Sequence, residues 1–288
     1  MIIRFFSSFC SSSICSEAYT RISELLNDIA FDNNSQSCKP NSFRFTDGDD
    51  YTHAVILNTA MPLLTIPKEN VIGLAFEPHV FLGLTPSFIA YAGKYIGKYF
   101  IGEKGNLPKP FIEHFSYMWH ITPIPTPPIK TKIMSLMISR KMFTSGHQYR
   151  HTLFKRIINS NLPIDIYGNG CEKYKHILDT RLKGSFQEKE PYEDYLFHIA
   201  IENTITPHYF SEKIMNPLLC NTMPIYLGAK HIDTYFPKMV IKLTGEIDKD
   251  MTMLADICEN QSRYLNLINI AAVKKTINFA NVVKLFAE

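Results

Sequence analysis

The chain has 288 residues, 45% of them hydrophobic and 20% charged, which is enough apolar material for a sizeable core and excludes wholesale disorder. Thirty basic and twenty-seven acidic residues leave a net charge of +3. No dense stripe of Lys and Arg occurs, so the composition argues against a dedicated nucleic-acid-binding protein. It suits an enzyme that takes an anionic small molecule.

The first part of the chain alternates apolar strands with helical segments. Residues 2–9 predict a buried strand, and apolar positions at helical spacing predict a helix that begins near Ser16. Further strands are predicted at residues 51–58 and 71–76, and a helix and a short strand are predicted within residues 86–102. This alternation is typical of a parallel α/β sheet.

A proline-rich stretch then divides the chain. The four prolines between Pro123 and Pro128 exclude a helix or a central strand and predict an extended linker. Beyond it the α/β pattern restarts, with strands predicted at 132–139, 162–170, 195–203 and 223–228, and helices at 147–160 and 211–220. We therefore predict two Rossmann-like α/β domains facing a cleft, residues 1–128 and 129–288, with a final helix that stays in the second domain or crosses back.

The sequence predicts neither a membrane segment nor a secreted protein. No stretch of about eighteen apolar residues occurs, and the apolar runs near the N-terminus are too short for a signal peptide. Six cysteines are scattered without a C-x-x-C pair or a histidine at metal-ligand spacing. We expect reduced thiols and a soluble, cytoplasmic protein.

Several ligand-binding motifs are missing or misplaced. The segment Asp47-Gly48-Asp49 resembles a diphosphate–metal motif, but it precedes a predicted strand instead of following one, and an Asp/Gly-rich turn explains it. No G-x-G-x-x-G follows a strand, and neither a P-loop nor a histidine pair at zinc spacing is present. We therefore expect no metal at the site and a divalent cation that is at most stimulatory.

The most informative stretch is residues 195–228. Asn203 ends a predicted strand there, and Tyr209, Glu212 and Lys213 crowd the start of the next helix. The free N–H groups of a helix start can hold a phosphate, to which a lysine adds charge, and a carboxylate can accept hydrogen bonds from ribose. An ordinary helix cap, Ser211 followed by an acidic residue in the first turn, explains the same residues without a ligand. Both interpretations stay open on this segment alone.

Three blocks in this stretch resemble the signature of the α-1,3/4-fucosyltransferases, glycosyltransferase family 10. The blocks are Phe197–Thr204, Tyr209–Ile214 and Pro224–Gly228, at the spacing that the family has. Weaker similarity places Arg150 where the family has an arginine near a helix start. Glu77-Pro78 is similar to the short element that supplies the family's proposed catalytic base, although the serine of that element is missing here.

The resemblance implies the two-Rossmann GT-B architecture, with an acceptor-binding first domain and a second domain that binds a GDP-sugar. It covers the catalytic core only, without the membrane anchor or the terminal cysteine pairs of the Golgi members. It implies that Glu77 is the catalytic base and that the donor is held by Arg150, Asn203, Tyr209, Glu212 and Lys213. No cofactor is implied, and the expected partners are a nucleotide-sugar donor and a glycan acceptor, with no nucleic acid.

The expected activity is inverting transfer of fucose from GDP-fucose to a hydroxyl group of a glycan. Two alternatives remain at this stage: the same fold acting on another nucleotide-6-deoxyhexose, and an inactive homologue that only binds carbohydrate. Hydrolysis of the donor separates the enzyme from the binding protein. The acceptor is not readable from the sequence, because its specificity is expected in loops such as residues 32–50 and 79–87.

Overall fold

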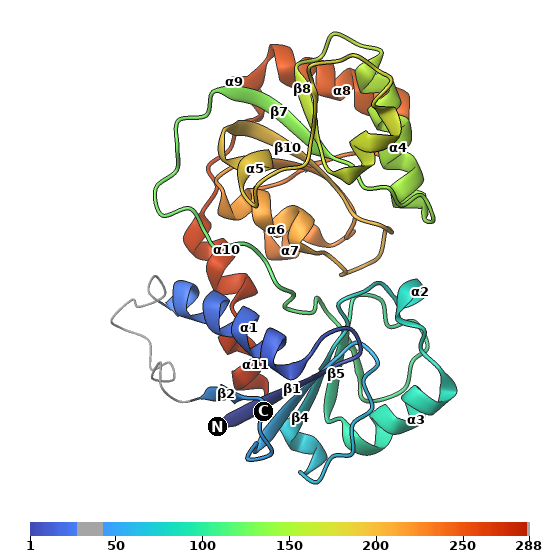
Figure 1. Ribbon diagram of the computed structural model, residues 1–288, viewed down its shortest axis with the longest axis vertical. Helices are drawn as coiled ribbons and strands as arrows, with labels where there is room; N and C mark the ends of the chain where they lie inside the picture. The colour runs from blue at the N-terminus through green and yellow to red at the C-terminus, as the bar shows by residue number, and fades with distance from the viewer. Residues whose placement is uncertain (28–42, 287–288) are drawn as a thin grey trace. The chain divides into compact units, whose positions relative to one another are not determined.

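The structure is a computed structural model that describes residues 1–27 and 43–286 and consists of two units (Figure 1). Unit 1 comprises Met1–Thr122, Thr206–Tyr209 and Lys274–Glu288, and unit 2 comprises Pro123–Ile205 and Phe210–Val273. The chain thus passes between the units several times. Among the described residues, no helix combines the length and the apolar character that a membrane span requires.

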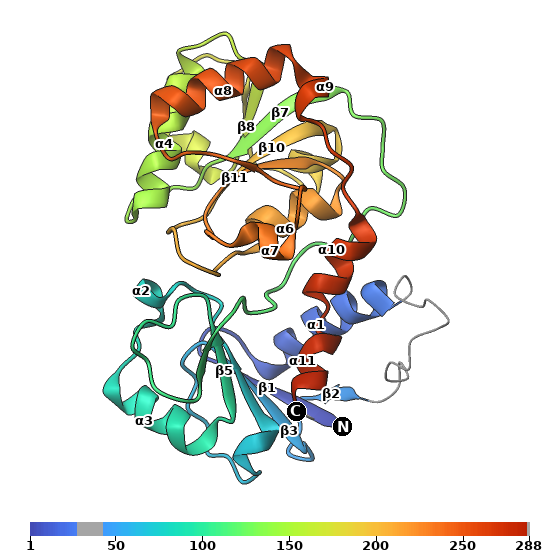
Figure 2. The same ribbon diagram turned by 180° about the vertical axis from the view of Figure 1, so that it is seen from behind.

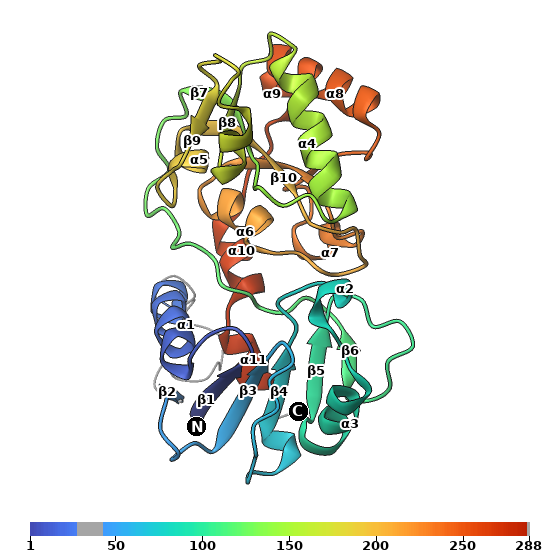
Figure 3. The ribbon, with the colours of Figure 1, turned by 45° about the vertical axis from the view of Figure 1, so that its right-hand side comes forward.

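Unit 1 contains a parallel sheet with the strand order β2-β1-β3-β4-β5-β6. Its strands are β1 (Ile2–Ser7), β2 (Arg44–Thr46), β3 (His53–Leu57), β4 (Val71–Leu74), β5 (Lys98–Ile101) and β6 (Phe111–Glu113). Its helices are α1 (Ser12–Asn27), η1 (Lys68–Asn70), α2 (His79–Leu82), α3 (Pro86–Tyr95) and α11 (Ala280–Leu285). Figure 3 shows α1 beside β1 and β2, and α3 beside β5.

The C-terminal segment completes the core of unit 1. The ring of Phe279 lies 4.3 Å from that of Tyr19 on α1 and 5.7 Å from that of Phe5 on β1, centroid to centroid. The Lys98 ammonium also donates a hydrogen bond to the carbonyl of Leu285 on α11, at 2.8 Å. Burial of these large rings supplies most of the driving force that holds the segment against β1.

The boundaries of the first two elements differ from those predicted. β1 ends at Ser7 because the Ser7 hydroxyl accepts hydrogen bonds from the N–H groups of Phe9 and Cys10, which turns the chain. α1 begins at Ser12 instead of Ser16, since the Ser11 hydroxyl accepts from the N–H of Ile14 and caps the helix earlier.

Unit 2 contains a second parallel sheet, with the strand order β12-β11-β10-β7-β8-β9. Its strands are β7 (Lys132–Met137), β8 (Ile164–Tyr167), β9 (Leu182–Gly184), β10 (Tyr195–Ile201), β11 (Met223–Leu227) and β12 (Ile241–Lys242). Its helices are α4 (Ser145–Ile158), η2 (Asn169–Tyr174), α5 (Glu190–Glu193), α6 (Glu212–Leu219), α7 (Ile232–Tyr235), α8 (Ile247–Glu259) and α9 (Gln261–Tyr264). The prediction of two parallel α/β sheets is confirmed.

The helices of unit 2 cover both faces of its sheet. α4 packs against α8 on one face, which Figure 2 shows from its side, whereas α5, α6 and α7 lie on the other face, toward the viewer in Figure 1. Helix α10 (Ile270–Ile277) follows α9 and carries the chain from unit 2 to unit 1.

The proline-rich segment contains neither helix nor strand between β6 and β7. The division between the units falls at Thr122–Pro123, six residues before the expected start of the second domain at residue 129. The Lys130 ammonium anchors the end of this segment in unit 2, because it donates to the carbonyls of Tyr192, Glu193 and Cys220 and to the Thr222 hydroxyl.

Candidate functional site

Four predicted site residues lie in unit 2, near the carboxyl end of β10 and the start of α6. Asn203 follows β10, Glu212 and Lys213 open α6, and Arg150 lies in the second turn of α4. In a parallel sheet the carboxyl ends of all strands lie at one edge, where ligands of α/β proteins bind. These residues occupy that edge.

The start of α6 is organised by Ser211. This residue has an extended backbone and its side chain accepts a hydrogen bond from the N–H of Lys213, so it is the helix N-cap. The Lys213 ammonium lies 3.1 Å from the Ser211 hydroxyl and 3.0 Å from a carboxylate oxygen of Glu212. The side chain of Lys213 is 24% exposed and that of Glu212 is 45% exposed. Both charged groups are therefore held in place and reach the surface.

Glu202, which was not among the predicted residues, is a buried carboxylate beside them. Its side chain has no exposed surface, and it accepts hydrogen bonds from the N–H and the hydroxyl of Ser211, both at 2.8 Å. Its carboxylate also lies 3.7 Å from the Lys213 ammonium. Glu202 thus fixes the cap of α6 and the lysine beside it. The signal in the sequence was a carboxylate that directly follows an apolar strand.

Burial and charge act against each other in this cluster. Burial raises the pKa of Glu202, although Lys213 and the hydrogen bonds from Ser211 oppose that rise. Burial alone would lower the pKa of Lys213, but the carboxylates of Glu212 and Glu202 outweigh it and hold this pKa above its usual value. Lys213 is therefore a protonated, permanent cation at neutral pH.

Two glycines allow the close packing around Glu202. A Cβ atom on Gly146, at the start of α4, would lie 2.0 Å from the carbonyl oxygen of Glu202, so only glycine fits there. The N–H of Gly146 instead donates to the carbonyl of Asn203 at 3.1 Å. A Cβ on Gly228, after β11, would lie 2.5 Å from Cγ of Glu202. The final glycine of the third sequence block therefore makes room for the buried carboxylate.

Arg150 is buried behind the strand end. Its guanidinium donates to the carbonyl of Ile201 and lies 3.5 Å from the side-chain oxygen of Asn203. Burial lowers the pKa of Arg150, and the carboxylates of Glu202 and Glu212 counteract this. The guanidinium nevertheless stays charged, because its ordinary pKa lies far above neutral. Arg150 supports the strand end and adds a positive charge beneath it.

His147 reports the positive potential of this region. Its pKa falls to about 4, through burial first and then through the charges of Arg150, Lys141 and Lys213. The ring is therefore neutral at pH 7, and its Nδ1 lies 2.7 Å from the hydroxyl of Thr144, the N-cap of α4. Burial is the larger cause of this shift, and the three cations add a smaller contribution from positive potential.

Tyr209 and Glu77 lie in unit 1. The role predicted for Tyr209 in donor binding stays a prediction, and its side chain packs within unit 1. The ring is buried, its hydroxyl donates to the carbonyl of Phe76 at 3.3 Å, and a Cβ on Gly102 would collide with its Cβ at 2.3 Å. Tyr209 precedes the cap of α6 by two residues, and its side chain is used to pack against the ends of β4 and β5.

Glu77 follows the carboxyl end of β4 on a well-anchored backbone. The N–H of Phe76 donates to the side chain of Asn58 at 2.8 Å, while the carbonyl of Phe76 accepts from Tyr209. Pro78 then forms the N-cap of α2. The partly buried Glu77 is therefore held at the edge of the unit 1 sheet where parallel α/β proteins bind ligands.

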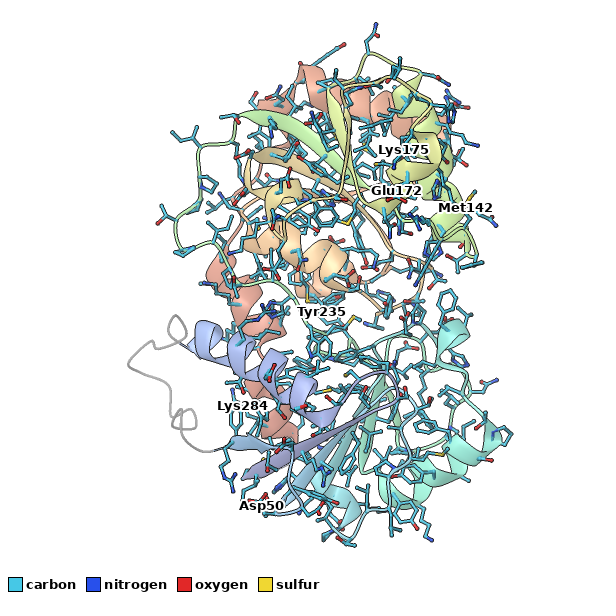
Figure 4. All side chains as sticks on the ribbon, in the orientation of Figure 1. Asp50, Met142, Glu172, Lys175, Tyr235 and Lys284 are labelled. Carbon is cyan, nitrogen blue, oxygen red and sulfur yellow. The ribbon has the colours of Figure 1, made fainter. Side chains whose placement is uncertain are left out.

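The acidic segment before β3 lies at the opposite edge. Arg4 pairs with Asp49, and Arg44 pairs with Asp50 at 2.6 Å. Figure 4 labels Asp50 at the amino end of β3. Within residues 1–27 and 43–286, no group of three His, Cys, Asp or Glu side chains is arranged to hold a metal ion.

We expect Glu202→Ala to lower the free energy of unfolding by about 3 kcal/mol, since it leaves the Ser211 donors and Lys213 without their buried partner. Urea-induced unfolding measures this change. The matched control is Glu246→Ala, which removes an exposed carboxylate from a surface pair with Lys249 and should cost less than about 1 kcal/mol. Equal effects of the two substitutions would show that Glu202 does not organise the site.

Part of the chain matches the model of one protein family. Residues 127–267 match the family model described as glycosyltransferase family 10 (fucosyltransferase) C-term. The chain is 34% identical over 83 residues to α-(1,3)-fucosyltransferase B of Drosophila melanogaster, covering 27% of this chain and 18% of that protein. It is 28% identical over 153 residues to a protein of Acanthamoeba polyphaga mimivirus named as a fucosyltransferase, covering 49% and 24%. The chain thus spans about a quarter of the length of these relatives or less.

Solved structures share the whole fold. An α1,3-fucosyltransferase superposes with a TM-score of 0.56 at 13% identity, over 100% of this chain and 89% of the other. A DNA-modifying β-glucosyltransferase superposes with a TM-score of 0.51 at 11% identity, over 100% and 98%. At such identities the similarity establishes the GT-B fold alone.

Proposed function

We propose that this chain, whose residues 127–267 match the model of glycosyltransferase family 10, is a member of that family and transfers fucose from GDP-fucose to a glycan hydroxyl with inversion. One of the solved structures with this fold is an α1,3-fucosyltransferase with GDP-fucose, at 12% identity. The chemistry itself rests on the residues of this chain.

Lys213 and Arg150, the two cations at the carboxyl edge of the unit 2 sheet, carry the proposal. Lys213, protonated and partly exposed at the start of α6, supplies charge to a diphosphate, and the positive end of the helix dipole adds to it. Glu212, with half of its side chain exposed, accepts hydrogen bonds from ribose or sugar hydroxyls. Asn203 offers an amide at the strand end, and Arg150 adds positive potential. The departing GDP is thereby stabilised electrostatically, which is usually the largest contribution to such a reaction.

Unit 1 supplies the acceptor side of the proposed reaction. Glu77 takes the proton from the attacking hydroxyl of the glycan as the oxygen reaches the anomeric carbon. Tyr209 acts through the backbone in this scheme, because its hydroxyl holds the carbonyl of Phe76, next to Glu77. Residues 1–128 are thus proposed to bind the acceptor and residues 129–288 to bind the donor, with the C-terminal segment returning to unit 1.

Donor binding and donor hydrolysis test the function without knowledge of the acceptor. GDP-fucose and GDP are expected to raise the melting temperature, and UDP-glucose is not, because only bound ligands stabilise the folded state. Slow release of GDP from GDP-fucose should continue in EDTA, since the proposed charge stabilisation comes from side chains.

Each alternative has its own outcome in these measurements. Binding without any release of GDP, in the presence of candidate glycans, would favour the inactive carbohydrate-binding homologue. If another nucleotide-6-deoxyhexose is bound and hydrolysed in preference to GDP-fucose, that sugar nucleotide is the donor. Loss of activity in EDTA with recovery in manganese would contradict metal independence.

A further inference from the structure

Two cysteines lie together at the carboxyl end of β1. Cys10 belongs to the turn after the strand, and Cys15 belongs to the first turn of α1. Their sulfur atoms are 3.0 Å apart. A disulfide bond requires about 2.0 Å, so the two sulfurs need to approach by only about 1 Å.

The local hydrogen bonds hold the two thiols in this position. The Ser7 hydroxyl accepts a hydrogen bond from the N–H of Cys10, and it lies 3.5 Å from the Cys10 sulfur. The N–H of Cys15 donates to the carbonyl of Ser11 at 3.2 Å. The backbone at both ends of the pair is therefore held by the turn and by the first turn of the helix.

The two thiols differ in access. Cys15 is fully buried, and burial together with its contact to Cys10 raises the pKa of its thiol. Cys10 is partly exposed, so an oxidant reaches it first. The other cysteines in the described part of the chain, Cys171, Cys220 and Cys258, belong to η2, to the end of α6 and to α8.

We infer that Cys10 and Cys15 form a thiol-oxidation site that closes to an intramolecular disulfide when it meets a small disulfide such as oxidised glutathione. The Cys10 thiolate attacks one sulfur of oxidised glutathione, and the first glutathione thiolate leaves. Once Cys10 is bonded to glutathione it carries no charge that opposes ionisation of Cys15; the Cys15 thiol then loses its proton, and its sulfur attacks the Cys10 sulfur and expels the second glutathione. The two cysteines together lose two protons and two electrons, and oxidised glutathione is reduced to two thiols.

The disulfide restrains the turn that follows β1. Phe9, in this turn, is 48% exposed, and its ring lies 5.9 Å from that of Phe76 and 5.8 Å from that of Trp119. A disulfide bond between Cys10 and Cys15 restrains Phe9, the residue before Cys10, relative to α1. The amide hydrogens of Phe9 and Cys10, both bonded to Ser7, then exchange more slowly with solvent.

The experiment uses the purified full chain, exposed to reduced or oxidised glutathione, alkylated and digested with trypsin. Cleavage after Arg4 and Arg21 releases one peptide that contains both cysteines and no other. We expect this peptide to lose the mass of two hydrogen atoms and to resist alkylation after oxidation. Cys15→Ser should stop at a glutathione adduct on Cys10, Cys10→Ser should give neither product, and Cys171→Ser should behave as the parent.

Two results would overturn the inference. One is a parent chain in which both thiols remain open to alkylation, or in which the glutathione adduct on Cys10 persists. The other is a disulfide that forms while the amide exchange of Phe9 and Cys10 stays unchanged, since the bond would then not restrain the turn. Neither readout depends on the proposed transferase activity. Because Cys10 is partly exposed, we expect the Cys10→Ser variant to fold like the parent, and circular dichroism checks this.

Discussion

Glu77→Gln is expected to lower the rate of sugar transfer by about 10²–10⁴, the range typical of a lost general base. The amide is nearly the same size as the carboxylate but does not take a proton from the acceptor hydroxyl. Because the base acts on the transition state, binding of GDP and GDP-fucose should stay within about threefold of the parent. Transfer kinetics and donor titration on the same preparation measure the two effects.

The control for Glu77 lies at the same edge of the same sheet. Glu103 follows β5, is exposed, and carries the same carboxylate, so Glu103→Gln should leave transfer near the parent rate. If Glu77→Gln also transfers at near the parent rate, the base is another residue. If donor binding and rate fall together, Glu77 has a structural role. The backbone anchors at Phe76 make such a role testable through the melting temperature.

The fold could be predicted because the strong elements are apolar and regular. The central strands of both sheets, such as β4 and β10, are buried on both faces and read as short apolar runs between turns. The edge strands β2, β6, β9 and β12 were missed, since each has only two or three residues, and pairing with a neighbour defines them more than their own sequence does.

The sequence indicated more candidate residues for binding the donor than for binding the acceptor. Asn203, Glu212 and Lys213 could be proposed as neighbours because a strand end and a helix start lie close in the sequence; their role in donor binding stays a prediction. Glu202 was missed for a physical reason: a fully buried carboxylate is rare, and its partner Ser211 is nine residues away. The sequence could not show that hydrogen bonds from Ser211 take the place of water around the Glu202 carboxylate.

The contacts of the Tyr209 side chain could not be predicted from the sequence. Its position two residues before the cap of α6 suggested a shared pocket with Glu212, but a residue near a helix start can point either way. The contact with Phe76 joins positions 133 residues apart, and no local pattern carries such information. The close approach at Gly102, which excludes any Cβ, fixes where the ring lies.

Lys213→Ala is expected to weaken GDP binding by about 10–100-fold, because a hydrogen bond to a charged group is worth about 1.5–3 kcal/mol. Guanosine, which lacks the diphosphate, should bind within about threefold of the parent. The affinity of the parent for GDP should also fall more steeply with salt than that of the variant, since screening acts on the lost charge. Isothermal titration at several salt concentrations measures all three quantities.

The ratio of GDP to guanosine affinity separates the diphosphate role from a structural one. Lys213 also neutralises buried Glu202 at 3.7 Å, so Lys213→Ala lowers the melting temperature, and titrations are made where both proteins are folded. Lys249→Ala, which removes a 65% exposed cation from the same unit, should change neither affinity. Equal weakening of GDP and guanosine would mean that the lysine only shapes the site. Unchanged GDP affinity in folded Lys213→Ala would remove Lys213 from the donor site and leave Arg150 and the start of α6 as the remaining sources of positive potential.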